Sequence, residues 1–148
     1  MAQATLARRW LGPDYRLGFF FVLPVVGLVL LLGIGNALFH VEVIVSGVPD
    51  YGVRVALAAI VSMIMLIGGR ITPSFTRNWL VHAGAKRLPI PFGHFDTVAV
   101  LVAVSALAAW VAIPDNPATA GALLLAGLLQ ILRLSRWAGF AAWGEPLV

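Results

Sequence analysis

Histidine carries the most specific chemistry in this sequence, because a neutral imidazole nitrogen can ligate haem iron, copper or zinc. His40 follows Asn36 by four residues near the end of a long apolar run. On a helix the two side chains share one face, and polar groups inside a membrane are costly enough to indicate a functional site. Asn36 and His40 are therefore candidate cofactor-binding residues. The alternative is that His40 lies among lipid headgroups and bonds water.

The two other histidines, His82 and His94, are further candidate metal ligands. His82 follows Asn78 by four residues, on a segment predicted below to form a short helix. The alternative for both is a solvated loop histidine. Both are expected on the side of the membrane opposite His40, and a haem cannot span a core of about 30 Å. A haem iron on His40 would therefore take its second ligand from outside this chain, or a ligand other than histidine.

Patterns typical of catalysis are missing from the sequence. The chain contains no cysteine, which excludes disulfides and cysteine-based zinc or iron–sulfur sites. We expect its six carboxylates in loops on both sides of the membrane, and none is spaced to pair with a nucleophile. No phosphate-binding loop, HExxH pattern or calcium-binding loop is present. The sequence therefore favours a protein that is not an enzyme.

The composition predicts a membrane protein. Only 11% of the 148 residues are charged and 61% are hydrophobic, whereas roughly a quarter of the residues of a soluble domain are charged. Most of the chain must therefore face lipid or other helices. The net charge of +4 would suit nucleic acid, but the basic residues lie beside the apolar segments, where they set topology. The expected partner is the lipid bilayer, and no nucleic acid.

Four segments approach or exceed the roughly 20 apolar residues that a transmembrane helix needs: residues 17–39, 51–71, 97–113 and 118–136. The last two are joined by Pro114-Asp115-Asn116-Pro117, which is typical of a turn and predicts an antiparallel hairpin. A signal peptide is an alternative for the first segment, but its apolar run is longer than such peptides need and no cleavage site follows. The predicted fold is an all-α integral membrane protein with four transmembrane helices.

The basic residues predict the orientation, because they are enriched in cytoplasmic loops. In the four-helix topology nine of the ten fall on one side: Arg8, Arg9, Arg16, Arg70, Arg77, Lys86, Arg87, Arg133 and Arg136. Arg54 falls on the other side, together with Glu42, Asp50 and Asp115. Both termini and the middle loop are therefore expected in the cytoplasm.

The sequence also contains patterns that predict helix contacts and the structure of the middle loop. Small residues four apart favour close helix contacts, and four such pairs occur: Gly33/Ala37, Ala99/Ala103, Ser105/Ala109 and Ala122/Ala126. Thr72-Pro73 is typical of a helix start and predicts a short interfacial helix over about residues 73–83. The alternative is that the second span continues through a kink at Pro73. The proline-rich residues 88–93 are expected to be extended and to re-enter the bilayer.

Three runs resemble conserved segments of the NnrS family. The sequence Gly68-Gly69-Arg70-Ile71-Thr72-Pro73-Ser74-Phe75-Thr76-Arg77-Asn78 is similar to its GGR-x-(I/T)P-x-FT-x-N signature. The run from Asn36 to His40 resembles an N-x-x-FH segment, and the run from Trp143 to Leu147 resembles a W-x-EPL segment. The positions that match the signature are Gly68, Gly69, Arg70, Pro73, Phe75, Thr76 and Asn78.

The resemblance implies a multi-pass protein of the bacterial inner membrane that contains haem and copper and acts in the nitric-oxide response and under nitrosative stress. Arg70 would then pair with a haem propionate or a lipid phosphate. The alternative is that the signature only ends one span and begins the next helix. Family members are longer and have more spans, so we expect a fragment or truncated homologue that packs on further transmembrane helices or on a partner subunit.

Two other functions are compatible with the residues. The first is a transporter of small solutes or ions, in which Asn36 and Ser62 line the path. The second is a non-catalytic membrane scaffold or assembly subunit, which would pack on larger partners through its faces of small residues.

Overall fold

The computed structural model describes residues 13–82, 84 and 88–137, and these form four helices. The helices are α2 (Pro13–Ser46), α3 (Tyr51–His82), α4 (His94–Ala112) and α5 (Pro117–Ser135). Each is long and apolar enough to cross a membrane. The prediction of an all-α protein with four such helices is therefore confirmed.

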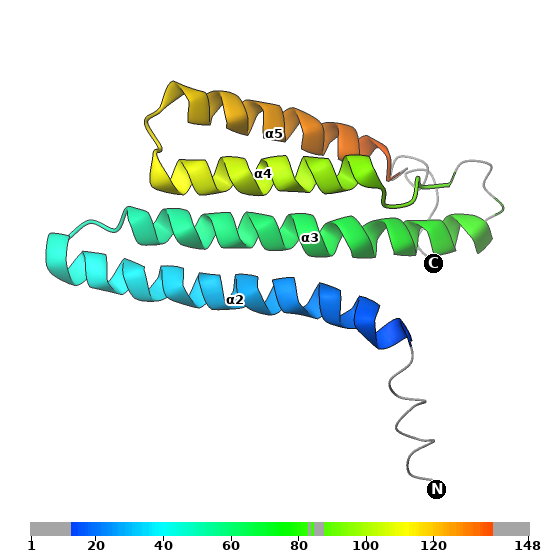
Figure 1. Ribbon diagram of the computed structural model, residues 1–148, viewed down its shortest axis with the longest axis horizontal. Helices are drawn as coiled ribbons and strands as arrows, with labels where there is room; N and C mark the ends of the chain where they lie inside the picture. Colours follow the sequence, from blue (N-terminus) through cyan, green and yellow to red (C-terminus); the bar gives the residue numbers. More distant parts are fainter. Residues whose placement is uncertain (1–12, 83, 85–87, 138–148) are drawn as a thin grey trace, which may run out of the picture.

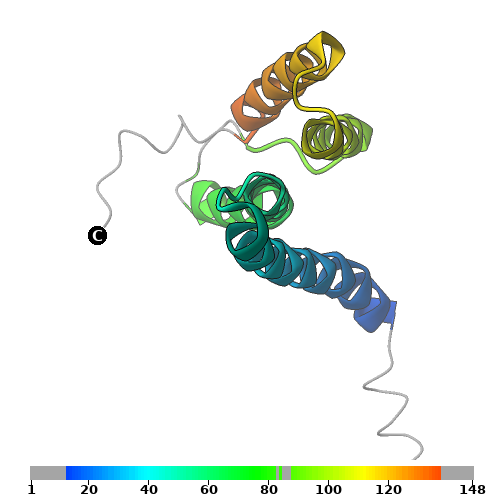
Figure 2. The ribbon, with the colours of Figure 1, turned by 90° about the vertical axis from the view of Figure 1, so that its left-hand side faces the viewer.

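Consecutive helices are antiparallel and lie side by side (Figure 1). α2 packs against α3, α3 against α4, and α4 against α5. Seen along the helices, α2 lies below α3 and the α4–α5 hairpin lies above it (Figure 2). The result is an open row of two hairpins, in which much apolar surface is left for lipid or for other helices. The exposure is greatest on α2, where only 6% of the residues in the most apolar stretch are buried.

Close contact between α2 and α3 depends on two glycines. A Cβ on Gly35 would lie 2.8 Å from the backbone nitrogen of Ala56, and a Cβ on Gly52 would overlap the backbone of Phe39. The expected pair Gly33/Ala37 does not make this contact, because both residues are exposed. The face of α2 that contacts α3 is therefore the one with Gly35, and not the predicted face with Gly33 and Ala37.

The α4–α5 hairpin uses small residues largely as expected. Ala99 and Ala103 are buried, and Ala126 is buried against the same cluster as Ala103. Ser105 is exposed, because the face of α4 that meets its neighbours carries Ala106 instead. Alanine at these positions lets the two backbones approach closely.

The loop between α2 and α3 is closed by a carboxylate. Glu42, near the end of α2, accepts hydrogen bonds from the backbone N–H groups of Asp50, Tyr51 and Gly52, at 2.9–3.0 Å. The first N–H groups of a helix have no partner within the helix and favour a negative charge. Glu42 thus caps α3, although the sequence suggested a loop residue.

The C-terminal part of α3 differs from the expected short helix. Residues 73–82 continue α3 without interruption, with Pro73 inside the helix, so the second of the two predicted arrangements holds; residue 83 lies outside the described part of the chain. Proline removes one N–H from the ladder of hydrogen bonds, yet the helix continues. Its 32 residues span about 48 Å, so its last turns reach past a hydrocarbon core of about 30 Å.

Residues 88–93 are not helical, as predicted. The Ile90 N–H donates to the carbonyl of Arg136 at 3.2 Å. This bond holds the segment before α4 against the end of α5 and brings the polar residues of both helix ends together.

Candidate functional site

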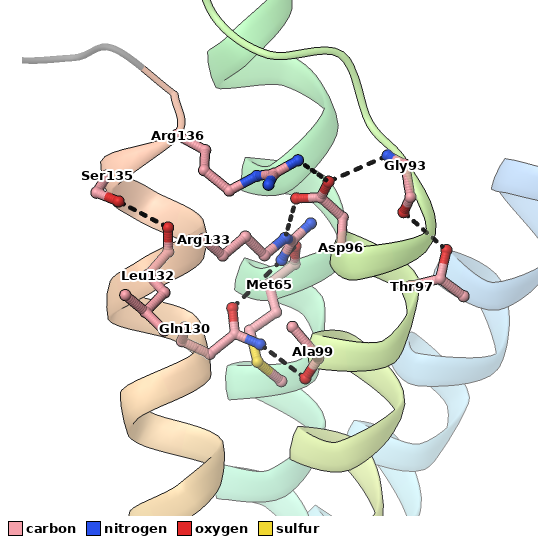
Figure 3. Close-up of polar contacts among 10 residues, drawn as sticks. All are labelled: Met65, Gly93, Asp96, Thr97, Ala99, Gln130, Leu132, Arg133, Ser135 and Arg136. Carbon is pink, nitrogen blue, oxygen red and sulfur yellow. Dashed lines mark hydrogen bonds and ion pairs between the residues drawn. The ribbon is translucent and has the colours of Figure 1, made fainter.

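Two opposite charges are buried where α3, α4 and α5 meet. Asp96, in the first turn of α4, is 3% exposed, and Arg133, in the last turn of α5, is 1% exposed. Arg133 Nε donates to Asp96 Oδ1 at 3.3 Å (Figure 3). Charged residues inside transmembrane helices are rare and usually pair with one another or with backbone carbonyls. We refer to Asp96, Gln130, Arg133 and Arg136 as the Asp96 cluster.

The guanidinium of Arg133 also bonds to a second helix. Its Nη1 donates to the backbone carbonyl of Met65 on α3 at 3.2 Å and to Gln130 Oε1 at 3.3 Å. Gln130 Nε2 in turn donates to the carbonyl of Ala99 on α4 at 3.1 Å. The fixed fork of donors on arginine suits such a junction. Through these bonds α5 is held to both α3 and α4.

Asp96 has two further partners. The Gly93 N–H donates to Asp96 Oδ2 at 3.1 Å, and Arg136 Nη2 lies 3.8 Å from the same oxygen. Asp96 is also close to the N-terminus of α4, where the helix dipole favours a negative charge. The carboxylate is therefore neutralised by two arginines and oriented by a backbone donor.

Aromatic rings surround the two arginines. The Arg133 guanidinium carbon lies 5.8 Å from the centre of the Phe92 ring and 5.5 Å from that of Trp137. Arg136 lies 4.8 Å from the centre of the Phe95 ring. Aromatic faces attract cations at such distances, so the rings stabilise the positive charges of both arginines.

Gly69, a residue of the signature, lies directly against Arg133 of the Asp96 cluster. A Cβ at this position would overlap the guanidinium of Arg133, so only glycine leaves room for that side chain on α3. Gly68 differs, because a Cβ there would meet nothing within 4 Å. The two neighbouring glycines of the signature therefore have separate roles.

We expect Gly69→Ala to destabilise the protein by about 1–3 kcal/mol relative to Gly68→Ala, because the added methyl group must displace a buried, ion-paired guanidinium. Both variants gain the same helix propensity, so their difference reports the contact alone. The free energy of unfolding in mixed micelles would be measured for both. Equal stabilities would show that Arg133 does not occupy the space above Gly69.

A cavity of about 260 Å³ adjoins the Asp96 cluster. Its lining contains one buried carboxylate, one exposed arginine and otherwise apolar or aromatic residues: Leu66, Gly69, Arg70, Pro73, Ile90, Phe92, Asp96 and Trp137. Three positions of the signature, Gly69, Arg70 and Pro73, thus line one cavity. The sequence had connected none of them with Asp96.

The other signature positions lie on the surface of α3. Phe75 is 71% exposed, Asn78 is exposed and Thr76 is half-buried. None of these three lines the cavity beside Asp96. The signature therefore combines residues that contact the rest of the chain with residues that are open to lipid or to another protein.

The candidate histidines are not brought together. His40 is exposed near the end of α2, where its ring meets that of Phe39 edge to face at 5.4 Å between centres. His82 ends α3 and His94 begins α4, at the opposite end of the antiparallel helices (Figure 1). His82 Nδ1 lies 2.7 Å from the carbonyl of Asn78. Among residues 13–82, 84 and 88–137, no three His, Cys, Asp or Glu residues form a group that could hold a metal ion.

The two residues of the suggested transport path also lie apart. Asn36 is exposed on α2, whereas Ser62 is buried and lines an apolar cavity of about 350 Å³ between α2, α3 and α4. Asn36 is not among the residues that line this cavity. Asn36 and Ser62 therefore do not line this cavity together.

The Asp96 cluster was not predicted from the sequence, because Asp96 was expected in a loop and Arg133 and Arg136 were considered only as determinants of topology. Two features of the sequence could have indicated the cluster. Asp96 follows Gly93 by three residues at the start of an apolar run, where an acidic residue is typical of a first helical turn. Gln130 precedes Arg133 by three residues, which places two polar side chains on one face of an otherwise apolar helix.

A family model described as NnrS protein matches residues 6–148, a range that includes the Asp96 cluster and the cavity beside it. Comparison with curated proteins and with solved structures gave no match.

Proposed function

The chain belongs to the NnrS family, and on this basis we propose that it acts in the response of bacterial cells to nitric oxide. The family match over residues 6–148 is the observation that carries the proposal. Support comes from the cavity, where signature residues Gly69, Arg70 and Pro73 adjoin a buried ion pair. Ionisable residues inside transmembrane segments are costly, and their presence indicates a candidate functional site.

The proposed location is the inner membrane, with both ends of the helical region in the cytoplasm. The start of α2, the end of α3, the start of α4 and the end of α5 lie at one end of the molecule (Figure 1). Arg77, Arg133 and Arg136 belong to these helix ends, whereas Arg54 and Asp50 lie at the opposite end of α3. Retention of basic residues in the cytoplasm would give this orientation.

Haem or copper is the cofactor that family membership suggests, with His40, His82 and His94 as candidate ligands. The described residues do not fit a complete site, since His40 lies at the opposite end of the helices from His82 and His94 and no group of three potential ligands occurs among them. Each histidine offers at most one ligand. We propose that His40, exposed beside Asn36 on α2, contributes a single ligand to a site completed by other polypeptide segments, and that Arg70 is too distant along the helices to share it.

One experiment tests the role in nitric-oxide stress and the ligand together. Cells that lack the gene would be complemented with the wild-type chain, with His40→Ala or, as a control, with Ser105→Ala, which changes an exposed residue of α4 that is not a candidate ligand. We expect the wild type and the control to restore growth under nitric oxide, and His40→Ala to fail. The protein purified from the same cells should show a haem absorption band or bound copper that His40→Ala reduces severalfold.

Several results would contradict the proposal. Growth that does not depend on the gene would reject the role in nitric-oxide stress, and an unchanged cofactor content in His40→Ala would reject the proposed ligand. A scaffold is the second candidate, because α2 exposes most of its apolar surface. Purification of a stable partner without any cofactor would favour that function.

A further inference from the structure

The cavity between α2, α3 and α4 contains one buried hydroxyl group. Ser62 of α3 is 7% exposed and lines this cavity, whose volume is about 350 Å³. Tyr51, the first residue of α3, adds a phenol at one end. Apart from these two, the described residues of the lining are alanine, valine and leucine. Because such walls cannot compensate a charge, the cavity suits a neutral molecule.

The Ser62 hydroxyl makes no hydrogen bond with any residue in the described part of the chain. A serine in a helix can donate to a carbonyl about one turn earlier, and two other serines of this protein do so. Ser46 donates to the carbonyl of Glu42 and Ser135 to that of Leu132, both at 2.8 Å. Buried polar groups of folded proteins nearly always have a partner. The hydroxyl of Ser62 therefore points to a partner within the cavity that it lines.

Ser62 lies near the middle of the membrane. It follows Tyr51 by 11 positions, which corresponds to about 16 Å along a helix. The hydrocarbon core is about 30 Å thick. With Tyr51 at one boundary, the hydroxyl of Ser62 is about halfway through the core, where water is lacking. A bonding partner at this depth must itself dissolve in lipid.

The cavity is accessible from the lipid. α2 and α4 both pack against α3, and the cavity lies between them. Leu31 on α2 and Val104 on α4 line it and are both exposed, so it opens sideways between these two helices. Its volume falls within the roughly 300–1,000 Å³ of sites that hold small molecules. A lipid-soluble molecule can therefore enter from the bilayer and be largely enclosed.

A single hydroxyl among apolar walls favours a ligand with a carbonyl group. A hydroxyl both donates and accepts hydrogen bonds. If the ligand also carried a hydroxyl at this depth, one of the two O–H hydrogens would be left without an acceptor. A carbonyl oxygen accepts the hydrogen of Ser62 and brings no donor of its own. A carbonyl compound therefore satisfies every donor at this end of the cavity.

We propose that this cavity binds a neutral, lipid-soluble carbonyl compound, whose carbonyl oxygen accepts a hydrogen bond from Ser62 and whose apolar body lies between α2 and α4. His40, His82 and His94 are not among the residues that line the cavity. The inference goes beyond the role in nitric-oxide stress and does not depend on it.

The probe that tests the site is benzophenone, a neutral ketone that dissolves in lipid. Under ultraviolet light its carbonyl takes a hydrogen atom from a nearby C–H bond and the two carbon radicals join, so the adduct records where the carbonyl was bound. The detergent-purified full chain would be irradiated at increasing benzophenone concentrations and its adducts located by mass spectrometry. We expect saturable labelling of residues that line the cavity, such as Leu28 and Leu107. Labelling that only rises in proportion to concentration would show partition into the micelle and overturn the proposal.

The hydrogen bond is tested by removing either of its partners. Ser62→Ala should weaken the binding of benzophenone about fivefold, as expected for loss of one hydrogen bond. Ser105→Ala is the matched control, because Ser105 is exposed on α4 and does not line the cavity; it should leave binding unchanged. Diphenylmethane has the same two rings without the carbonyl, and as a competitor it should bind about fivefold more weakly than benzophenone. Equal affinities in either comparison would overturn the proposal.

A further variant tests the cavity itself. Ala108 lines the cavity from an exposed position on α4, so the ring of Ala108→Phe would fill the space without displacing a buried residue. We expect this variant to lose the saturable labelling of Leu28 and Leu107. Unchanged labelling would place the ligand elsewhere and overturn the proposal. The growth experiment under nitric oxide can fail without affecting any of these outcomes.

Discussion

Replacing Asp96 with alanine should destabilise the folded protein by about 3–5 kcal/mol, because it leaves the guanidinium of Arg133 buried without its counter-ion. Arg133 is 1% exposed and lies between α3, α4 and α5, so it cannot reach water without separating them. Asp96→Asn should have a smaller effect, since an amide oxygen can still accept a hydrogen bond. The free energy of unfolding would be measured by titrating the micelle-bound protein with a denaturing detergent.

Asp50→Ala is the matched control. Asp50 forms an ion pair with Arg54 at 2.7 Å, but its side chain is 74% exposed, so we expect a change of at most about 1 kcal/mol. The double variant Asp96→Leu with Arg133→Met removes both buried charges and should be more stable than Asp96→Ala alone, because apolar replacements of a buried pair are often neutral. Similar losses for Asp50→Ala and Asp96→Ala would contradict the burial of the Asp96 cluster.

Replacing Gly52 with valine should cost about 3 kcal/mol and separate the first hairpin, because the new side chain would meet the backbone of Phe39. The obstructing atoms belong to the backbone of α2. An obstructing side chain could change its rotamer, but the backbone of a helix can move away only if the whole helix moves. The Gly52 N–H also donates to Glu42 at 2.9 Å, so movement of α2 would weaken the cap of α3. Cross-linking between cysteines introduced on α2 and α3 would report the separation.

Gly33→Val is the control for this change. Gly33 lies in the same hairpin, in a helix interior, and a Cβ there would meet nothing within 4 Å. Valine is a better helix former than glycine, so neither substitution should destabilise its helix through propensity, and a loss confined to Gly52→Val reports the contact of α2 with α3. A larger loss for Gly33→Val would indicate that the opposite face of α2 packs against another helix.

The candidate site was only partly predictable. Gly69 and Arg70 were selected through the family signature, but the partner of Gly69 is Arg133, which lies 64 positions later in the chain. The ion pair between Asp96 and Arg133 joins residues 37 positions apart. Neither contact produces a local pattern, because both depend on how α5 is placed against α3 and α4.

The four apolar helices, their antiparallel order and the concentration of basic residues toward one end could all be predicted from the amino-acid sequence. These properties follow from segment length, composition and turn residues, which a hydrocarbon core selects directly. Three features become visible only once the helices are packed: Gly35 rather than Gly33 meets α3, α3 continues through Pro73, and Asp96 is buried with Arg133. The physical reason is that lipid-facing and protein-facing sides of a membrane helix are similarly apolar, so periodicity does not reveal which side packs, and the buried charges become partners only once the helices are in place.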